Sequence, residues 1–259
     1  MTLGFLGTGA ITNAMVTGLC SDGAARETIL VSPRNAETAA KLAARFAQVQ
    51  IAASNQDLAD RSDTVVIAVR PQIAEGVLRE LHFRAGQHII SVVSGYPVRK
   101  LEGLVAPATH IARAVPLPSA ALRQSPTAIY PADEIAAGVL GRLGTVLEVA
   151  TEHEFDVVCT ATATMATYFA MAESVASWLT RHGIAAEKSR DYVAHLYAGM
   201  SDTTLREPGR SLRELAADHA TRGGTNEQVL KHLTDHHVFD AYSDALDAIL
   251  VRVTAASKA

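Results

Sequence analysis

The feature that most constrains the fold is a glycine-rich turn almost at the start of the chain. Thr2–Leu6 is a short apolar run typical of a buried strand, and Gly7-Thr8-Gly9 follows it directly. A helix is expected from about Ile11 to Cys20. In such a turn the first glycine permits a tight bend, and the second lets a pyrophosphate approach the backbone at the helix N-terminus. The turn therefore predicts a dinucleotide site formed by Gly7, Thr8, Gly9, Ala10 and Ile11, although Thr12 stands where the pattern has a third glycine or alanine.

Strands and helices continue to alternate up to about residue 150, which indicates a parallel sheet covered on both faces. The expected strands are Thr28–Val31, Gln50–Ala52, Thr64–Val69, His88–Val93, His110–Ala114, Ala128–Pro131 and Val146–Val149. Beyond about Thr151 the pattern contains no convincing strand. The expected helices there are Glu154–His182, Ala186–Arg206, Ser211–Asp218, Asn226–His236 and Phe239–Ala256. The sequence thus predicts an α/β domain over residues 1–150 and an all-helical domain over residues 151–259.

The residues after the second strand bear on which dinucleotide is bound. Sites that prefer NAD place a carboxylate there to hold the ribose 2′-hydroxyl. This chain has Ser32-Pro33-Arg34-Asn35 instead, with no carboxylate. A hydroxyl, a guanidinium and an amide suit a 2′-phosphate, because arginine presents a charged fork to phosphate oxygens. Ser32, Arg34 and Asn35 are therefore predicted to bind NADP(H), the alternative for Arg34 being a solvated loop side chain.

A second glycine-rich segment lies between two helices of the C-terminal half. Gly223 and Gly224 expose backbone N–H groups, and Thr225 can cap the helix that follows. Exposed N–H groups at a helix start suit a substrate carboxylate. The alternative is an ordinary N-cap with a flexible approach, and the loop alone does not decide between the two.

Histidines and cysteines offer weaker candidates. His232 and His236 have the i, i+4 spacing of metal ligands, but no obvious third ligand stands near them, so no metal is expected. His219 is a minor candidate for a general acid, because histidine is the side chain most often used for proton transfer. Cys20 and Cys159 lie in apolar helical contexts that favour packing over nucleophilic chemistry.

Charge and hydropathy limit the partners. The net charge is −4, so neither nucleic acid nor an anionic membrane is an expected partner. The N-terminus has no basic segment before its apolar run, which favours the cytoplasm. The stretch Val157–Leu179 carries one charge, Glu173, and is long enough to span a bilayer. Its threonines favour a helix buried inside a protein or dimer core instead.

Taken together, these segments resemble the pyrroline-5-carboxylate reductase family along nearly the whole chain and in the same order. Gly4–Gly9 resembles its glycine fingerprint, Val69–Gln72 its V-K-P-Q turn near the cofactor, and Arg113–Pro116 its R-x-M-P segment beside the nicotinamide. The other matching segments are Ser91–Gly95, Asp156–Tyr168 at the start of the dimerisation helix, and Arg222–Thr225 at the substrate-holding P-G-G-T loop.

The resemblance implies a Rossmann-like dinucleotide-binding domain followed by an all-helical dimerisation and substrate-binding domain. It implies hydride transfer from NADPH to the C=N bond of a small cyclic imino acid, with pyrroline-5-carboxylate giving proline. It implies a homodimer or a higher homo-oligomer formed through the C-terminal helices. Further cofactor contacts are expected at Ala68, Val69, Arg70, Pro71, Ser94 and Gly95, substrate binding at Arg222, Gly223 and Gly224, and catalytic roles at Thr225 and Asn226.

The chain departs from the family around the substrate. Leu117-Pro118-Ser119 replaces the family's N-T-P, and residues 162–167 contain no glycine where the family has S-G-S-G-P-A. Arg222 replaces a proline and Asn226 a threonine. Two alternatives therefore stay open: a diverged NADP-dependent oxidoreductase acting on another imine or carbonyl, and a non-catalytic cofactor-binding protein. A hydroxyacid dehydrogenase is disfavoured, because the long helix lacks the lysine that those enzymes use as the acid.

Overall fold

The computed structural model describes residues 1–21 and 27–258, with side chains described as far as residue 255. The chain forms two compact units. One contains Met1–Cys159 together with the last ten residues from Leu250, and the other contains Thr160–Ile249. The sequence predicts a boundary after residue 150 between a cofactor-binding domain and a dimerisation domain. The two units are defined by packing and not by these functions, so the functional boundary stays a prediction.

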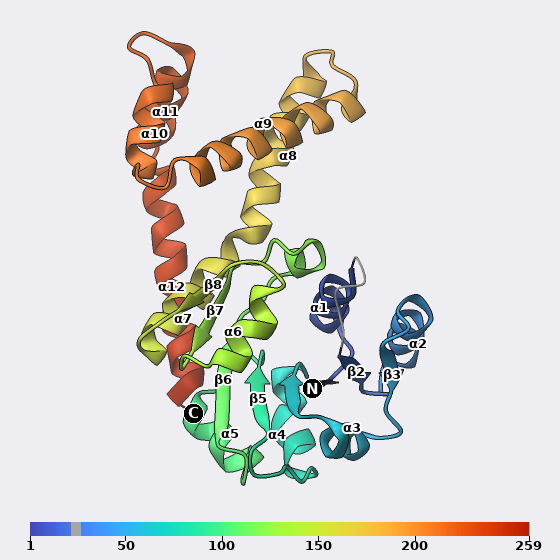
Figure 1. The fold of residues 1–259 in the computed structure, drawn as a ribbon. Helices are drawn as coiled ribbons and strands as arrows, with labels where there is room; N and C mark the ends of the chain where they lie inside the picture. Colours follow the sequence, from blue (N-terminus) through green and yellow to red (C-terminus); the bar gives the residue numbers. More distant parts are fainter. Residues whose placement is uncertain (22–26, 259) are drawn as a thin grey trace. The chain divides into compact units, whose positions relative to one another are not determined.

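The first unit is built on one eight-stranded sheet with the strand order β3-β2-β1-β4-β5-β6-β7-β8 (Figure 1). The strands are β1 (Thr2–Leu6), β2 (Thr28–Val31), β3 (Val49–Ile51), β4 (Thr64–Ile67), β5 (His88–Ser91), β6 (His110–Ala114), β7 (Thr127–Tyr130) and β8 (Val146–Glu148). All neighbours are parallel except β6 and β7. The expectation of a parallel sheet is wrong for this pair. Between the two strands stands only the short 3-10 helix η2 (Pro118–Leu122), whereas a parallel return usually runs through an α-helical crossover.

Helices cover both faces of this sheet. They are α1 (Ala10–Cys20), α2 (Ala36–Arg45), α3 (Asn55–Arg61), α4 (Pro71–Arg79), α5 (Val98–Val105), α6 (Glu134–Gly141) and α7 (Glu152–Ala161). Buried side chains of α1, α2 and α6 share one apolar cluster, and those of α3, α4 and α5 share another. The helix starts follow from local chemistry: the side chains of Ser54 and Asp133 cap α3 and α6, and Pro71 occupies the first turn of α4.

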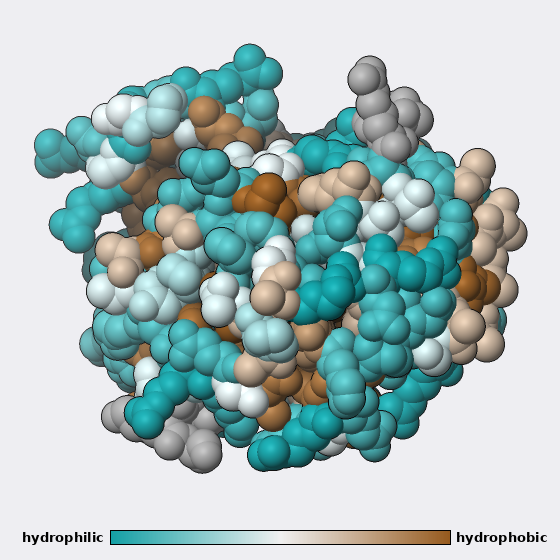
Figure 2. All heavy atoms as spheres, turned by 60° about the horizontal axis from the view of Figure 1, so that its bottom comes forward, coloured by the Kyte–Doolittle hydropathy of each residue, from teal (hydrophilic) through white to brown (hydrophobic). Residues whose placement is uncertain are grey.

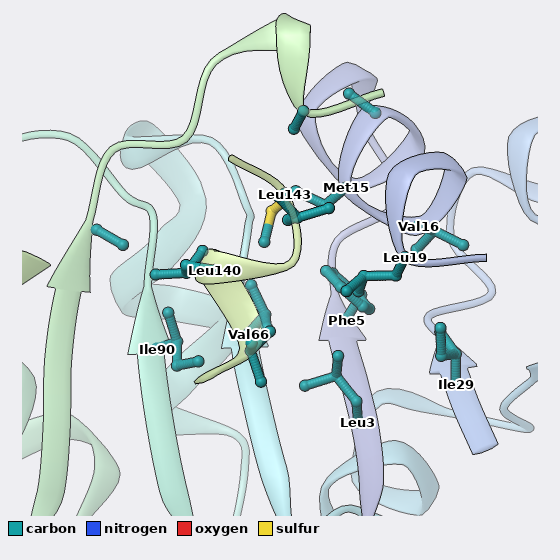
Figure 3. Close-up of a cluster of buried hydrophobic side chains, with 14 of the residues drawn as sticks. Leu3, Phe5, Met15, Val16, Leu19, Ile29, Val66, Ile90, Leu140 and Leu143 are labelled. Carbon is teal, nitrogen blue, oxygen red and sulfur yellow. The ribbon is translucent and has the colours of Figure 1, made fainter. Parts of the chain in front are cut away.

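The side-chain alternation of the strands explains why there are two clusters. On β4, Val66 belongs to the cluster under α1 and α6, whereas Val65 and Ile67 belong to the other. Figure 3 shows Met15 and Leu19 of α1 lying over Phe5 of β1. Because both faces are buried, the central strands are continuous apolar runs, which is the signal that the sequence carried. Figure 2 shows a face of the molecule that is mostly hydrophilic, with apolar residues in separate groups.

In its described residues the second unit is entirely helical. It contains the 3-10 turn η3 (Thr162–Thr164), α8 (Met165–Arg181), α9 (Ala186–Arg206), α10 (Leu212–His219), α11 (Thr225–Asp235) and most of α12 (Val238–Lys258). The single helix expected over Glu154–His182 is therefore interrupted by η3, where Thr164 bonds back to the carbonyl of Ala161 at 2.8 Å. The predicted fold class, a Rossmann-like α/β domain followed by helices, is confirmed.

The long helices of the second unit expose much apolar surface. Phe169, Leu205 and Leu212 are between 68% and 79% exposed. The stretch Glu152–Arg181 is long and apolar enough to cross a membrane by length and composition, and 17% of its most apolar window is buried within the chain. The sequence predicts that this helix is buried, but the rest of its own chain covers only a small part of it.

Both cysteines lie in packed surroundings. Cys20 is buried in α1, and burial raises the pKa of its thiol to about 11. Cys159 lies in α7, where burial raises the pKa to about 12 despite the opposing charge of Arg113. Because the thiolate is the nucleophile, neither group is activated, in agreement with a packing role.

Two helical glycines differ in the space around them, which predicts opposite effects of alanine. A Cβ on Gly18 of α1 would overlap the backbone oxygen of Ala120 in η2, whereas a Cβ on Gly76 of α4 meets nothing within 4 Å. We expect Gly18→Ala to destabilise by about 1–3 kcal/mol through overpacking. Gly76→Ala should stabilise by up to about 1 kcal/mol through helix propensity. Urea unfolding of both variants measures this, and a Gly18→Ala variant as stable as the parent contradicts the close packing of α1 on η2.

The raised thiol pKa values predict slow modification of the folded protein. At pH 8 a thiol with a pKa near 12 is ionised in about one molecule in ten thousand, and unfolding returns the pKa to its ordinary value and restores reactivity. Titration with a disulfide reagent should find no rapidly reacting thiol in the native protein. In guanidinium chloride it should find both of the chain's 2 cysteines. A native thiol that reacts as fast as free cysteine contradicts this assignment.

Candidate functional site

The predicted cofactor residues lie at the carboxyl ends of four neighbouring strands. The segments that follow β2, β1, β4 and β5 contain, in turn, Ser32–Asn35, Gly7–Ile11, Ala68–Pro71 and Ser94-Gly95. Because these strands are parallel, the four segments meet at one edge of the sheet (Figure 1). The strand order reverses between β1 and β4, and open α/β sheets bind ligands outside the carboxyl ends at such a point.

The glycine turn packs closely against the end of β4 at Gly7, and it is open to solvent at Gly9, where α1 begins. Gly7 has φ +104°, and a Cβ there would lie 2.7 Å from the carbonyl oxygen of Ala68, so only glycine fits. Gly9 is the N-cap of α1 and is exposed, and a Cβ on it would meet nothing within 4 Å. No side chain caps this helix. The first N–H groups of α1 therefore face an open space, as an anion site requires.

Hydroxyl groups hold this turn from below. The backbone N–H of Gly7 donates to Ser32 Oγ at 3.0 Å, and Thr8 Oγ1 donates to the Ser32 carbonyl at 2.6 Å. Thr12 Oγ1 donates to the Gly7 carbonyl at 2.6 Å. Thr12, the departure from the glycine pattern, thus fixes the turn through its hydroxyl. The sequence pattern predicts that Ser32 contacts the cofactor phosphate together with Arg34 and Asn35. In the structure Ser32 is buried, and its hydroxyl stabilises the glycine turn instead.

Arg34 and Asn35 lie on the surface at the end of β2. Asn35 is the N-cap of α2, and its side-chain oxygen accepts from the N–H of Thr38 at 3.3 Å. Arg34 is exposed, and within the described parts of the chain no carboxylate pairs with its guanidinium. In the described part of the chain, the end of β2 thus carries an exposed arginine that is not in an ion pair.

The turns after β4 and β5 are tied together. The Ala68 N–H donates to the Leu6 carbonyl at 2.8 Å, which fixes the second turn beside the first. Arg70 is the exposed N-cap of α4, and Gly95 has φ +75° in the neighbouring turn. Tyr96, which the sequence analysis did not single out, donates its hydroxyl to the Pro71 carbonyl at 3.0 Å. Its burial could be inferred only once the two turns were known to be neighbours.

Arg113 forms a buried ionic cluster rather than a surface contact. Its guanidinium lies 2.8 Å from Glu152 and 3.2 Å from Asp156, and it stacks over the ring of Phe155 at 4.4 Å. Glu152 also accepts from the N–H of Val98 at 2.9 Å. The cluster therefore joins the end of β6 to the starts of α5 and α7. Removing Arg113 would leave the two carboxylates without their cation, and breaking a buried ion pair in this way typically costs about 3–5 kcal/mol.

The second glycine segment, in the helical unit, is held by its own backbone. Gly223 has φ +75°, and its N–H donates to Glu227 Oε2 at 2.7 Å. The Gly224 N–H donates to the Thr221 carbonyl at 2.8 Å, and a Cβ on Gly224 would lie 2.7 Å from Thr221 Oγ1. Both glycines are therefore required by this turn, whether or not a ligand binds there.

The polar side chains of this loop have distinct surroundings. Gly224 is the N-cap of α11 and Thr225 is its first residue, so the expectation that Thr225 caps the helix is wrong. Asn226 Nδ2 donates to the His219 carbonyl at 3.1 Å. His219 Nδ1 lies 2.8 Å from the Leu215 carbonyl, which can only accept, so this nitrogen carries the hydrogen. Arg222 is exposed and has no ion-pair partner among the described residues.

The histidines that stand close to a carboxylate are not the ones that the sequence suggested. His232 and His236 stack at 4.2 Å on α11, without a third ligand group among the described residues. A different cluster, His88, His110 and Asp133, has its ligand atoms within 4.8 Å of one another. These residues are far apart in the chain, and only the strand register brings them together.

Known protein families match both the N-terminal and the C-terminal half of this chain. A family model described as NADP oxidoreductase coenzyme F420-dependent matches residues 2–95, and one described as pyrroline-5-carboxylate reductase dimerisation matches residues 152–255. A pyrroline-5-carboxylate reductase of Haemophilus influenzae is 24% identical over 96% of this chain and 95% of its own length. One from Pseudomonas aeruginosa is 27% identical over 176 residues, which span 64% of each protein.

The fold agrees with a solved structure as well. The pyrroline carboxylate reductase of Plasmodium falciparum, solved with NADP bound, has 20% sequence identity and a TM-score of 0.85, and the match covers 99% of this chain and 98% of that one. The fold and the length of this chain thus match those of a solved pyrroline carboxylate reductase. Residues 2–95 match an NADP oxidoreductase model, residues 152–255 match the pyrroline-5-carboxylate reductase dimerisation model, and the chain is similar to pyrroline-5-carboxylate reductases over nearly its whole length.

Proposed function

We propose that this chain is an NADPH-dependent reductase of a small cyclic imino acid, converting pyrroline-5-carboxylate to proline. The observation that carries the proposal is the open N-terminus of α1 behind Gly7 and Gly9, on a chain whose other half matches a pyrroline-5-carboxylate reductase dimerisation domain. The relatives named above are pyrroline-5-carboxylate reductases, and this chain spans nearly the full length of the Haemophilus protein.

The residues present fit a dinucleotide. The space above Gly9 admits a pyrophosphate, and the N–H groups and dipole of α1 favour its charge. Thr8, Ala10 and Ile11 surround this position, and the Ala68–Pro71 and Ser94-Gly95 turns extend the same edge. NADPH, when bound there, supplies the hydride. The chain contributes a rigid turn, since Ser32 and Thr12 fix its backbone.

The 2′-phosphate of NADPH is assigned to Arg34 and Asn35. Arg34 is exposed and unpaired within the described chain, so its guanidinium is available to an anion. Asn35 keeps its amide donors, because its capping bond uses the oxygen. Ser32 supports the phosphate site indirectly, through the turn that it braces.

The substrate carboxylate is assigned to the start of α11, beside the Gly223-Gly224 turn, whose own two N–H groups are used within the turn. The first N–H groups of a helix lack intrahelical partners and attract an anion. Thr225 and Asn226 are exposed at this start, where they can orient the imine. No side chain is assigned as proton donor. Holding an already polarised C=N in place supplies the rate through proximity and preorganised charge.

Assembly completes the proposal. Within one chain, α8, α9 and α10 leave large apolar side chains exposed, among them Phe169, Leu205 and Leu212. Residues 152–255 match a dimerisation model, so we assign this surface to a homodimer or a larger homo-oligomer rather than to a membrane. A cytoplasmic location is consistent with that assignment.

A second candidate is a reductase of another imine or a carbonyl. The observation that favours it is Arg222, an exposed and unpaired cation beside the Gly223-Gly224 turn, at a position where the family has proline. A substrate with an additional acidic group would pair with this guanidinium. A non-catalytic cofactor-binding protein is the outcome if no substrate is turned over.

Turnover distinguishes these candidates. Absorbance at the nicotinamide band near 340 nm would follow the purified chain with NADPH or NADH and cyclic imino acids of five- and six-membered rings. We expect oxidation of NADPH with pyrroline-5-carboxylate and formation of proline. Faster turnover of a more acidic imine that is lost in Arg222→Ala identifies the second candidate, whereas NADPH binding without turnover of any compound contradicts an imine reductase.

Cofactor preference tests Arg34. We expect Arg34→Ala to raise the KM for NADPH by about 10–100-fold, since a charge-assisted contact to phosphate is worth about 1.5–3 kcal/mol, and to leave the KM for NADH unchanged. Arg45→Ala, at the far end of α2, is the matched control and should change neither constant. Equal losses with both cofactors in Arg34→Ala would show that Arg34 does not read the 2′-phosphate.

A further inference from the structure

We propose that His88, His110 and Asp133 form a site for one divalent transition-metal ion of the zinc class. The site lies at the amino ends of β5 and β6, the opposite edge of the sheet from the glycine turn. It is separate from the proposed reductase chemistry, and it would act on the stability of the α/β unit.

Strand register places the two histidines side by side. His88 is the first residue of β5 and His110 the first of β6, and they are direct partners in the parallel ladder. The alternation of side chains puts them on the same face as Ile90 and Ala112, which belong to the apolar cluster under α6. Asp133, the N-cap of α6, reaches this face from above the sheet.

The carboxylate is oriented by the helix that it caps. Asp133 Oδ1 accepts from the Ala136 N–H at 2.7 Å, and Oδ2 faces His88 Nδ1. One oxygen is thus fixed by the backbone while the other points at the imidazole. A metal-ligating carboxylate is commonly held in this way by a second hydrogen bond.

The distance between the two groups suits a shared ion better than a hydrogen bond. His88 Nδ1 and Asp133 Oδ2 are 3.6 Å apart, too far for a hydrogen bond. Two ligands of a tetrahedral zinc ion, each about 2.0–2.1 Å from the metal, stand about 3.3 Å apart. His88 Nδ1 is also buried without a hydrogen-bond partner, a state that a metal bond would relieve.

His110 is the third ligand of the proposed site, and it lies close to the other two. The rings of His88 and His110 stack with centroids 4.5 Å apart, and the ligand atoms of all three groups lie within 4.8 Å of one another. His110 is exposed, so rotation of its side chain can bring its nitrogen to the ion. Two imidazoles and one carboxylate favour zinc, cobalt or nickel over calcium or magnesium. The exposed side leaves a coordination position for water.

Bound there, the ion would add a further link between β5 and β6, which already pair in the sheet, and would tie both strands to α6. It would bond β5 and β6 through the histidines and the start of α6 through Asp133. A ligand that binds only the folded state raises stability in proportion to the logarithm of its concentration over Kd. The predicted consequence is a metal-dependent rise in Tm.

Cobalt binding tests the site. Tag-free, chelator-treated full-length protein would be titrated with Co²⁺, whose visible absorption reports imidazole and carboxylate ligation, and Zn²⁺ would then compete. We expect one equivalent of Co²⁺ per chain, displacement by Zn²⁺, and a higher Tm with either ion. His110→Asn and Asp133→Asn should each weaken binding by at least about tenfold. Asparagine still caps a helix, so Asp133→Asn keeps α6 intact.

His236→Asn is the matched control, because His232 and His236 form the chain's other close histidine pair. It should retain the Co²⁺ band and the Tm shift of the parent. Three results overturn the proposal: no Co²⁺ band, a band that His110→Asn and Asp133→Asn leave unchanged while the circular dichroism of both remains native, or a band lost only in His236→Asn.

Discussion

The close approach of the Gly7 turn to the Ala68 carbonyl is the constraint on which the cofactor edge depends. Only a residue without a Cβ can carry β1 into α1 at that separation. The contact brings the ends of β1 and β4 together where the strand order reverses, and it leaves the start of α1 uncovered. Ser32 and Thr12 then hold the turn with hydroxyl groups that are buried and fully used. The edge is therefore preformed before any ligand arrives.

A second constraint holds the other side of the same sheet. Arg113 is buried at the end of β6, and its charge is balanced by Glu152 and Asp156. Glu152 simultaneously accepts from the first turn of α5. A buried arginine beside two carboxylates is costly to desolvate, and the contacts favour the observed arrangement of β6, α5 and α7, because separating Arg113 from both carboxylates leaves buried charges unpaired. Arg113, in the segment that resembles the family's R-x-M-P, thus holds the end of β6 to the starts of α5 and α7.

Much of this could be predicted from the sequence, because it rests on local signals. The glycine turn, the apolar β4 run and the change to helices near residue 151 are each readable from neighbouring residues. What could not be predicted depends on register or on the route of a loop. The antiparallel β6–β7 pair follows from the shortness of η2, and the role of Ser32 follows from where β1 ends beside β2. The meeting of His88 with His110 and Asp133 requires the whole strand order.

The two halves of the proposed site differ in how far family resemblance can be carried. At the proposed cofactor edge, backbone geometry and buried hydroxyls fix the shape of the turn, and the side chains proposed to bind the 2′-phosphate, Arg34 and Asn35, lie exposed beside it. In the substrate loop, the turn is closed by bonds that involve Gly223, Gly224, Thr221 and Glu227, none of which is among the changed positions. Asn226 does contribute one side-chain bond, to the His219 carbonyl, whereas Arg222 forms no ion pair among the described residues. The bonds that close the turn itself use neither side chain, so under the proposed function a change of substrate would rest on Arg222 and Asn226, while the backbone of the turn would stay as it is.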